Sequence, residues 1–160
     1  MTEKYYPIEL LHWSGMSDEF LDKVKEILTL YPDYIHTLNS MNDNALIIAC
    51  RVGNLEITKY RVGNLEITKY LVENTNVNIQ HRTGEGNALT VAVQQGRAEI
   101  ANYLVLNSNI EVERDALNED ILKILEIKKN YKNLQDTLEN DKNSNANLIN
   151  NKKIKNSSKI

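Results

Sequence analysis

The sequence predicts an all-α protein in which helix–turn–helix units stack into a solenoid. The triplet Asn44-Ala45-Leu46 recurs as Asn87-Ala88-Leu89, 43 residues later. Between these triplets the decapeptide RVGNLEITKY occurs twice in tandem, at residues 51–60 and 61–70. Without one copy of this duplication the period is 33 residues, which is typical of helical repeat proteins. A unit of this size cannot bury its own apolar face, so neighbouring units must form the core by stacking.

Composition and charge are those of one folded domain with a polar tail. The chain has 160 residues, a net charge of −3 and 26% charged residues, which fits a single domain. Residues 141–160 carry five Lys and one Asp, so the preceding body is acidic. An acidic body disfavours a nucleic-acid groove, for which a clustered basic face is expected.

The single cysteine, Cys50, excludes an intrachain disulfide and a cysteine-based zinc cluster. It indicates a reducing compartment. Residues 1–7 lack the apolar segment of a Sec signal peptide, and no apolar run approaches 18 residues. We therefore expect a monomeric cytoplasmic protein that does not interact with a membrane.

The repeat domain is expected at residues 9–138, after a leader of residues 1–8. Its first unit, residues 9–41, contains the apolar segment ELLHWS and then an amphipathic helix that Asp18 can cap. Pro32 is expected to end this helix, because the residue before a proline disfavours the helical conformation.

The second and third units cover residues 42–84 and 85–117. Each has a short apolar helix, a glycine turn, a second helix and an extended loop. A capping helix is expected at residues 118–138. Residues 139–160 are rich in Asn and Lys and cannot bury enough surface to offset their ordering entropy, so we expect a disordered tail.

The duplication disturbs this pattern. Ten helical residues rotate by about 1000°, roughly 80° short of three turns, so one continuous helix would turn Ile57 and Ile67 to different faces. Gly63 would then lie inside a helix, at a cost of about 1 kcal/mol relative to Ala. We therefore expect one copy to stay in register with the stack while residues 53–62 loop out.

Three motifs recur at fixed places in these units. The first helices carry Leu46-Ile47-Ile48-Ala49 and Leu89-Thr90-Val91-Ala92, the turns carry Gly53-Asn54-Leu55 and Gly96-Arg97-Ala98, and Val77-Asn78 opens an extended loop. Together they resemble the ankyrin repeat family over roughly residues 8–125. The resemblance implies an ankyrin-type solenoid with extended finger loops, about three repeats and a C-terminal capping helix.

The resemblance also implies structural roles in the core and at the turns for His12, Leu46, Ala49, Gly53, Gly63, Leu89, Ala92 and Gly96. His12 matches a family histidine that bonds to the backbone between units. Asn44-Ala45 and Asn87-Ala88 replace the usual Thr-Pro, which is expected to weaken the hydrogen bonds at the helix start without removing them. Asn74 and Asn107 stand where the helix-ending Gly is usual, and Asn tolerates the left-handed conformation expected there.

Proteins of this family bind partners through the finger tips and the concave face of the first helices. The resemblance therefore implies a non-catalytic function in protein–protein interaction, with an unknown protein as partner. By position it implicates Asn42, Asp43, Arg51, His81, Arg82, Thr83, Glu85, Gln94, Gln95, Glu113 and Arg114, with Met41 beside them. Asn-rich members occur in intracellular bacteria, large viruses and protists, so delivery to a host cell as an effector is an alternative to a cytoplasmic location.

No residue pattern predicts an enzyme, a metal site, a cofactor or a small-molecule substrate. His36 and His81 lie in loops without a partner at ligand spacing, and Gly84-Glu85-Gly86 lacks the third glycine of a phosphate loop. Cys50 takes the place of a small packed residue and is expected to be inert. The sequence is also compatible with two other functions. One is contact of Lys152-Lys153-Ile154-Lys155 with nucleic acid or an import factor, and the other is that of a regulatory fragment of a larger enzyme system.

Overall fold

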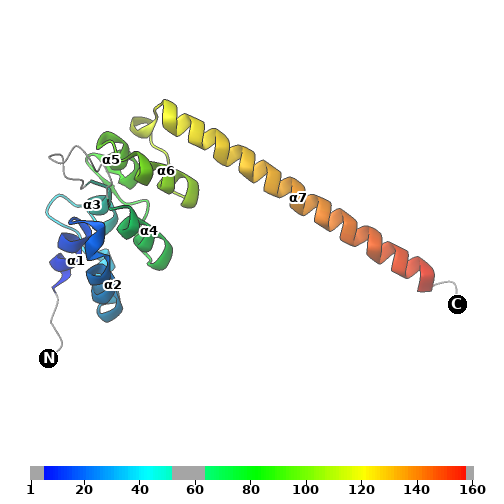
Figure 1. The fold of residues 1–160 in the computed structure, drawn as a ribbon, viewed down its shortest axis with the longest axis horizontal. Helices are drawn as coiled ribbons and strands as arrows, with labels where there is room; N and C mark the ends of the chain where they lie inside the picture. The colour runs from blue at the N-terminus through cyan, green and yellow to red at the C-terminus, as the bar shows by residue number, and fades with distance from the viewer. Residues whose placement is uncertain (1–5, 52–63, 158–160) are drawn as a thin grey trace. The chain divides into compact units, whose positions relative to one another are not determined.

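The computed structural model describes residues 6–51 and 64–157 (Figure 1). The chain divides into two compact units, Met1–Leu122 and Lys123–Ile160. Within the described residues, no helix is both long enough and apolar enough to cross a bilayer.

The described residues of the first compact unit form three helix pairs in chain order. These are α1 (Pro7–Ser14) with α2 (Leu21–Leu30), α3 (Ala45–Arg51) with α4 (Leu65–Asn74), and α5 (Ala88–Gln94) with α6 (Ala98–Asn107). The first helices stack in the order α1, α3, α5, and the second helices stack in the order α2, α4, α6 (Figure 1). This arrangement confirms the predicted all-α solenoid.

Short elements fill the connections between the helices. They are the 3-10 helices η1 (Asp18–Phe20), η2 (Pro32–His36) and η3 (Arg114–Ala116), and the antiparallel strands β1 (Arg82–Thr83) and β2 (Gly86–Asn87). The two strands make one finger loop a small hairpin, which the prediction of an extended loop did not specify.

The core lies between the two layers of helices. No more than 1% of the surface is exposed for Ile67 and Leu71 of α4 and for Ile100 and Leu104 of α6. Ile100 follows Ile67 by 33 residues, and Leu104 follows Leu71 by the same interval. Each such aliphatic side chain contributes roughly 1.5–3 kcal/mol when fully buried. The 33-residue period is therefore the repeat of the packed interface.

The second copy of the decapeptide supplies helix α4. Asp18 Oδ1 accepts a hydrogen bond from the Ile67 backbone N–H at 3.0 Å, and Asn64 Nδ2 donates to the Ser14 carbonyl at 2.7 Å. Asp18 therefore binds the first turn of α4, where the sequence suggested that it caps its own helix. The predicted loop at residues 53–62 lies outside the described residues.

Asparagine side chains cap the starts of three helices. Asn87 Oδ1 accepts from the N–H groups of Leu89 and Thr90, both at 3.1 Å. Asn44 Oδ1 accepts from Ile47 N–H and Asn118 Oδ1 from Ile121 N–H, each at 2.9 Å. The asparagines thus supply helix-start bonds of normal length.

Side-chain hydroxyl groups form hydrogen bonds at the C-terminal ends of α4 and α6. Thr75 Oγ1 donates to the Leu71 carbonyl at 2.6 Å and accepts from Val77 N–H at 3.2 Å. Ser108 repeats the pair with Leu104 at 2.7 Å and Ile110 at 3.2 Å. The expectation of left-handed asparagines at these ends is wrong, because Asn42 is the one non-glycine residue with positive φ in the described part of the chain.

Helix α7 extends over Glu119–Ser157, a length of 39 residues. Its first turn belongs to the first unit, where Ile121 is 2% exposed. The sequence predicts that the cap ends at residue 138 and that a disordered tail follows, whereas this helix continues well into that segment. Residues 119–157 contain no Gly or Pro, so no residue of the segment stops a helix once it has started.

Candidate protein-binding surface

Three finger loops carry most of the residues that the resemblance implicates. Finger 1 is residues 39–44 before α3, finger 2 is residues 78–87 before α5, and finger 3 is residues 109–114, which ends in the first residue of η3. Finger 2 contains the antiparallel pairs Arg82 with Asn87 and Thr83 with Gly86.

Asn39 shapes finger 1 from within. Its Oδ1 accepts hydrogen bonds from the backbone N–H of Met41 at 2.9 Å and of Asp43 at 2.8 Å. Asn42 follows with φ of 63°, a left-handed conformation that Asn adopts more readily than most residues. The side chain of Met41 is left 62% exposed at the tip.

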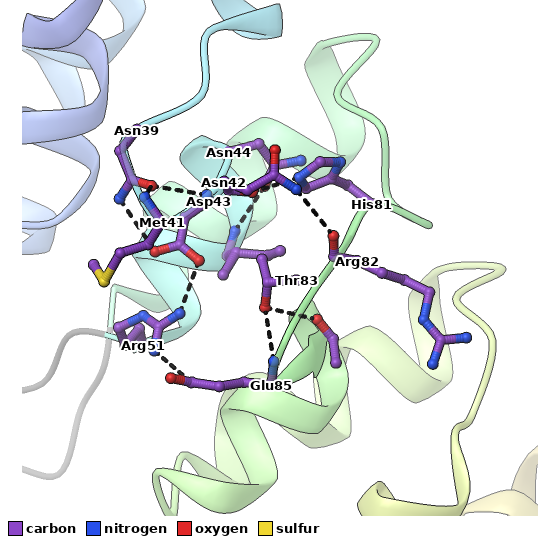
Figure 2. Close-up of polar contacts among 12 residues, drawn as sticks. Asn39, Met41, Asn42, Asp43, Asn44, Arg51, His81, Arg82, Thr83 and Glu85 are labelled. Atoms are coloured by element: carbon purple, nitrogen blue, oxygen red, sulfur yellow. Dashed lines mark hydrogen bonds and ion pairs between the residues drawn. The ribbon is translucent and has the colours of Figure 1, made fainter.

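Fingers 1 and 2 are joined by direct hydrogen bonds (Figure 2). His81 Nε2 lies 2.6 Å from the Asn42 carbonyl oxygen, which can only accept, so Nε2 carries the proton. Asn42 Nδ2 donates to the Arg82 carbonyl at 3.3 Å, and Asn44 Nδ2 donates to the Asn78 carbonyl at 3.1 Å. His81 therefore connects two fingers.

Arg51 anchors the base of both fingers. Its Nη2 lies 2.8 Å from Asp43 Oδ1, and its Nη1 bonds to Glu85 Oε2 (Figure 2). Burial acts to lower the pKa of the Arg51 guanidinium, but the bonds to the two carboxylates outweigh it and the pKa is raised above its usual value. The Asp43 side chain is fully buried beneath this bridge.

Fingers 2 and 3 are joined by a second set of contacts. Arg82 Nε lies 2.9 Å from Glu113 Oε1, while Glu113 Oε2 accepts from Thr90 Oγ1 at 2.6 Å. Gln80 Nε2 donates to the Asn109 carbonyl at 2.7 Å, and its Oε1 accepts from Glu111 N–H at 3.0 Å. The three fingers are therefore linked into one continuous surface by side-chain bonds.

Gly86 permits the close approach of finger 3. Its φ is +113°, and a Cβ atom there would lie 2.6 Å from Glu113 Oε2 and 2.7 Å from the Thr90 side chain. Gly96, in the turn between α5 and α6, also has positive φ, at +67°, but a Cβ atom there would meet open space.

The predicted binding residues differ in how accessible they are. Those with exposed side chains are Asn42, Arg82, Glu85, Gln94, Gln95 and Arg114. Arg51, His81, Thr83 and Glu113 are partly covered by their finger-to-finger contacts. Asp43 is 0% exposed, so it supports the surface from below and has no area to offer a partner.

Gln94 occupies the same position in its repeat as Arg51 does in the preceding one. It follows the capping Asn87 by seven residues, as Arg51 follows Asn44, and it ends α5 as Arg51 ends α3. The sequence did not single out Gln80 or Glu111 as links between fingers, or Asn39 as the residue that shapes finger 1. Polar loop residues are common, and their pairing depends on the spacing of the stacked units.

Five of the residues with implied structural roles lie in the core or in a turn of the described structure. Leu46, Ala49, Leu89 and Ala92 are fully buried, and Gly96 forms its turn with positive φ. His12 instead has an exposed side chain whose ring meets Trp13 edge-on, with centroids 4.9 Å apart. Gly53 and Gly63 lie outside the described residues.

Cys50 is buried in the core of the first compact unit. Burial raises the pKa of the Cys50 thiol to about 12, with a hydrogen bond to Thr68 acting in the opposite direction. A thiol with this pKa is not a nucleophile near neutral pH. Among the described residues, no group of three His, Cys, Asp or Glu side chains is arranged to hold a metal ion.

Comparison with known proteins gives one match. A family model described as ankyrin repeats, in three copies, matches residues 11–116. No curated protein and no solved structure matches the chain. The matched region begins in α1, includes all three fingers and ends at the last residue of η3.

Proposed function

The chain belongs to the ankyrin repeat family, and from this premise we propose that it binds a protein partner through the surface of the three linked fingers. Ankyrin repeats generally mediate protein–protein interaction. The proposed contact residues are Met41, Asn42, Arg82, Glu85, Gln94, Gln95 and Arg114.

The observation that carries the proposal is the chain of bonds across the fingers. Asn42 and Asn44 of finger 1 bind finger 2, and Arg51 at the end of α3 binds it as well. Arg82 and Gln80 of finger 2 bind finger 3 in the same way. A surface that is ordered before binding loses less conformational entropy when a partner docks. The fingers are therefore suited to rigid recognition.

The exposed side chains on this surface combine one apolar anchor with charged and amide groups. Met41 is 62% exposed, and a flexible thioether of this kind adapts to a partner pocket. Arg82 and Glu85 add both signs of charge, and the side chain of Arg82 is 63% exposed although it pairs with Glu113. We propose Met41 and Arg82 as the main anchors, since Arg and large apolar groups dominate such contacts.

The pairing of Arg82 decides which variants test the proposal cleanly. Arg82→Glu would place a second carboxylate beside Glu113, whose side chain is only 9% exposed. Like charges at this distance would destabilise the fingers themselves. The double variant Met41→Ala with Gln94→Ala avoids this problem, because it removes two exposed side chains and leaves the ion pair between Arg82 and Glu113 in place.

The test compares this double variant with Leu106→Ala, which removes an exposed apolar side chain from the second-helix layer. Each protein is immobilised, and the proteins retained from the source-cell lysate are quantified by mass spectrometry. We expect the retained amount of at least one protein to be about tenfold or more lower with the finger variant than with the wild type. With Leu106→Ala the retained amount of that protein should not change. Equal retention by both variants would contradict the proposal.

A further inference from the structure

Helix α7 carries an apolar stripe that the finger surface does not use. Ile127, Tyr131, Leu134 and Leu138 are 60%, 63%, 57% and 51% exposed. All four belong to the second compact unit. They lie on one continuous helix (Figure 1), and we call them the α7 seam.

The spacing of the seam is that of a coiled coil. Its residues follow one another by four, three and four positions, which is the alternation of the a and d sites of a heptad. Ile124, partly covered, occupies the preceding site of the same series. From Ile127 to Leu138 the apolar residues are confined to these sites. Such a stripe is narrower than the apolar face of a helix that lies on a globular core.

The residues beside the seam are basic or neutral. The flanking e and g sites between residues 123 and 142 hold Lys123, Lys128, Asn130, Gln135, Thr137 and Lys142. Glu126, Asp136 and Glu139 lie about 100° or more around the helix axis from the seam. Beside the apolar sites from Ile124 to Leu138, the flanks therefore carry two positive charges, Lys123 and Lys128, and no negative charge.

We infer that the α7 seam binds an amphipathic helix of a partner protein whose own seam is flanked by Asp or Glu. Opposite charges at the e and g sites select the partner in coiled coils. In a parallel pair of two α7 helices, Lys123 of one would face Lys128 of the other, so the flanks disfavour self-pairing in that orientation. The seam is interrupted after Leu138 by Asp141 and Asn145, so the contact spans about two heptads.

A membrane surface fits this helix less well. Residues 119–142 contain six acidic and five basic side chains, whereas helices that lie on anionic membranes are enriched in Lys and Arg on their polar face. The narrow seam also presents little apolar area for insertion between lipids.

The test uses the full chain and a fluorescent peptide of about three heptads, with Leu at the seam sites and Glu at the flanking sites. A second peptide carries Lys in place of each Glu. Binding is followed by fluorescence anisotropy at low and high salt. We expect the Glu peptide to bind, more weakly at high salt, and the Lys peptide to bind at least about tenfold more weakly.

Two matched pairs of variants locate the contact. Leu134→Asp should weaken binding of the Glu peptide by at least about thirtyfold, because it buries a charge in the seam, whereas Asn133→Asp introduces the same charge off the seam and should not. Lys128→Glu should weaken binding by about two- to fivefold, whereas Lys129→Glu, which faces away from the seam, should leave it unchanged. Circular dichroism checks that each variant keeps its helix content.

Several results would overturn the inference. They are equal binding of both peptides, no difference within either matched pair, or no binding of the Glu peptide. Sedimentation equilibrium that shows a dimer lost in Leu134→Asp would assign the seam to a second copy of the chain. Co-sedimentation with phosphatidylserine vesicles that is lost in the same variant would assign it to a membrane.

Discussion

The side chain of Asn44 holds finger 2 in place by donating from Nδ2 to the carbonyl oxygen of Asn78 at 3.1 Å. The same side chain caps α3 through its Oδ1. Asn87 repeats both contacts one unit later, with the Glu111 carbonyl at 2.7 Å as the acceptor. Asparagine at this place therefore couples the starts of α3 and α5 to the finger that follows each helix.

Replacing Asn44 should cost more stability than replacing an asparagine that acts only as a cap. Asn44→Ala removes the cap and the bond to the Asn78 carbonyl, for a combined loss of about 2–3 kcal/mol. Asn118→Ala removes the cap of α7 and should cost about 1 kcal/mol. Urea unfolding followed by circular dichroism measures both, and equal losses would show that the bond to finger 2 contributes nothing.

The two glycines with positive φ should respond differently to a methyl group. Gly96→Ala places the added Cβ in open space and should cost about 1–2 kcal/mol, the strain of the left-handed backbone. Gly86→Ala adds a clash with Glu113 and Thr90 to that strain, so its loss should exceed that of Gly96→Ala by at least about 2 kcal/mol. A chemical denaturation series tests the order, and a smaller loss at Gly86 would mean that finger 3 does not approach it closely.

Replacing Arg51 should destabilise the fold far more than replacing Glu85, its exposed partner. Arg51→Ala leaves the Asp43 carboxylate buried without its cation and should cost about 3 kcal/mol or more. Glu85→Ala removes a partner whose side chain is 51% exposed and should cost less than about 1 kcal/mol. Thermal melting of the two variants checks this, and similar melting temperatures would remove Arg51 as the anchor of the fingers.

Cys50 should make the protein sensitive to alkali. The pKa of its thiol is near 9.0 in the unfolded chain and is raised to about 12 by burial. The unfolded state therefore loses its proton first, so this contribution to stability is complete below pH 9 and declines as the pH rises toward 12. Burial and the hydrogen bond to Glu73 also raise the pKa of Tyr103, which acts in the same direction.

The measurement is the free energy of unfolding of the wild type and of Cys50→Ala between pH 8 and pH 11. The wild type should lose up to about 1.4 kcal/mol more than the variant for each pH unit above 9. If the free energies of unfolding of the two proteins fall in parallel with pH, burial does not raise the pKa of the Cys50 thiol. Thiol-reactive dye at pH 8 should label the native wild type only after denaturant is added.

The repeat period and the composition of the core were predictable from the sequence. The interval from Asn44 to Asn87, corrected for the duplication, places Leu46 and Leu89 in equivalent buried positions, because stacking requires the same apolar residues in every unit. The positions of the fingers followed from the same interval.

The contacts between units were not predictable, because they depend on distances that one unit does not contain. Asp18 accepts a hydrogen bond from the backbone N–H of Ile67 in the next repeat. The buried carboxylate of Asp43 is paired with the guanidinium of Arg51. The sequence predicts left-handed asparagines at the ends of α4 and α6, whereas the neighbouring hydroxyls of Thr75 and Ser108 donate hydrogen bonds to the last-turn carbonyls. Composition indicated that the segment after residue 138 has no core, but not that it lacks a helix stop.

The most direct test of the proposed interaction surface is site-specific photo-crosslinking. A benzoylphenylalanine residue is introduced at Met41 in one protein and at Leu106 in another, since both side chains are exposed and apolar. After irradiation in the source cells, the proposal predicts a covalent adduct with a partner protein from position 41 and none from position 106. Adducts from position 106 alone, or the same adducts from both, would contradict binding through the fingers.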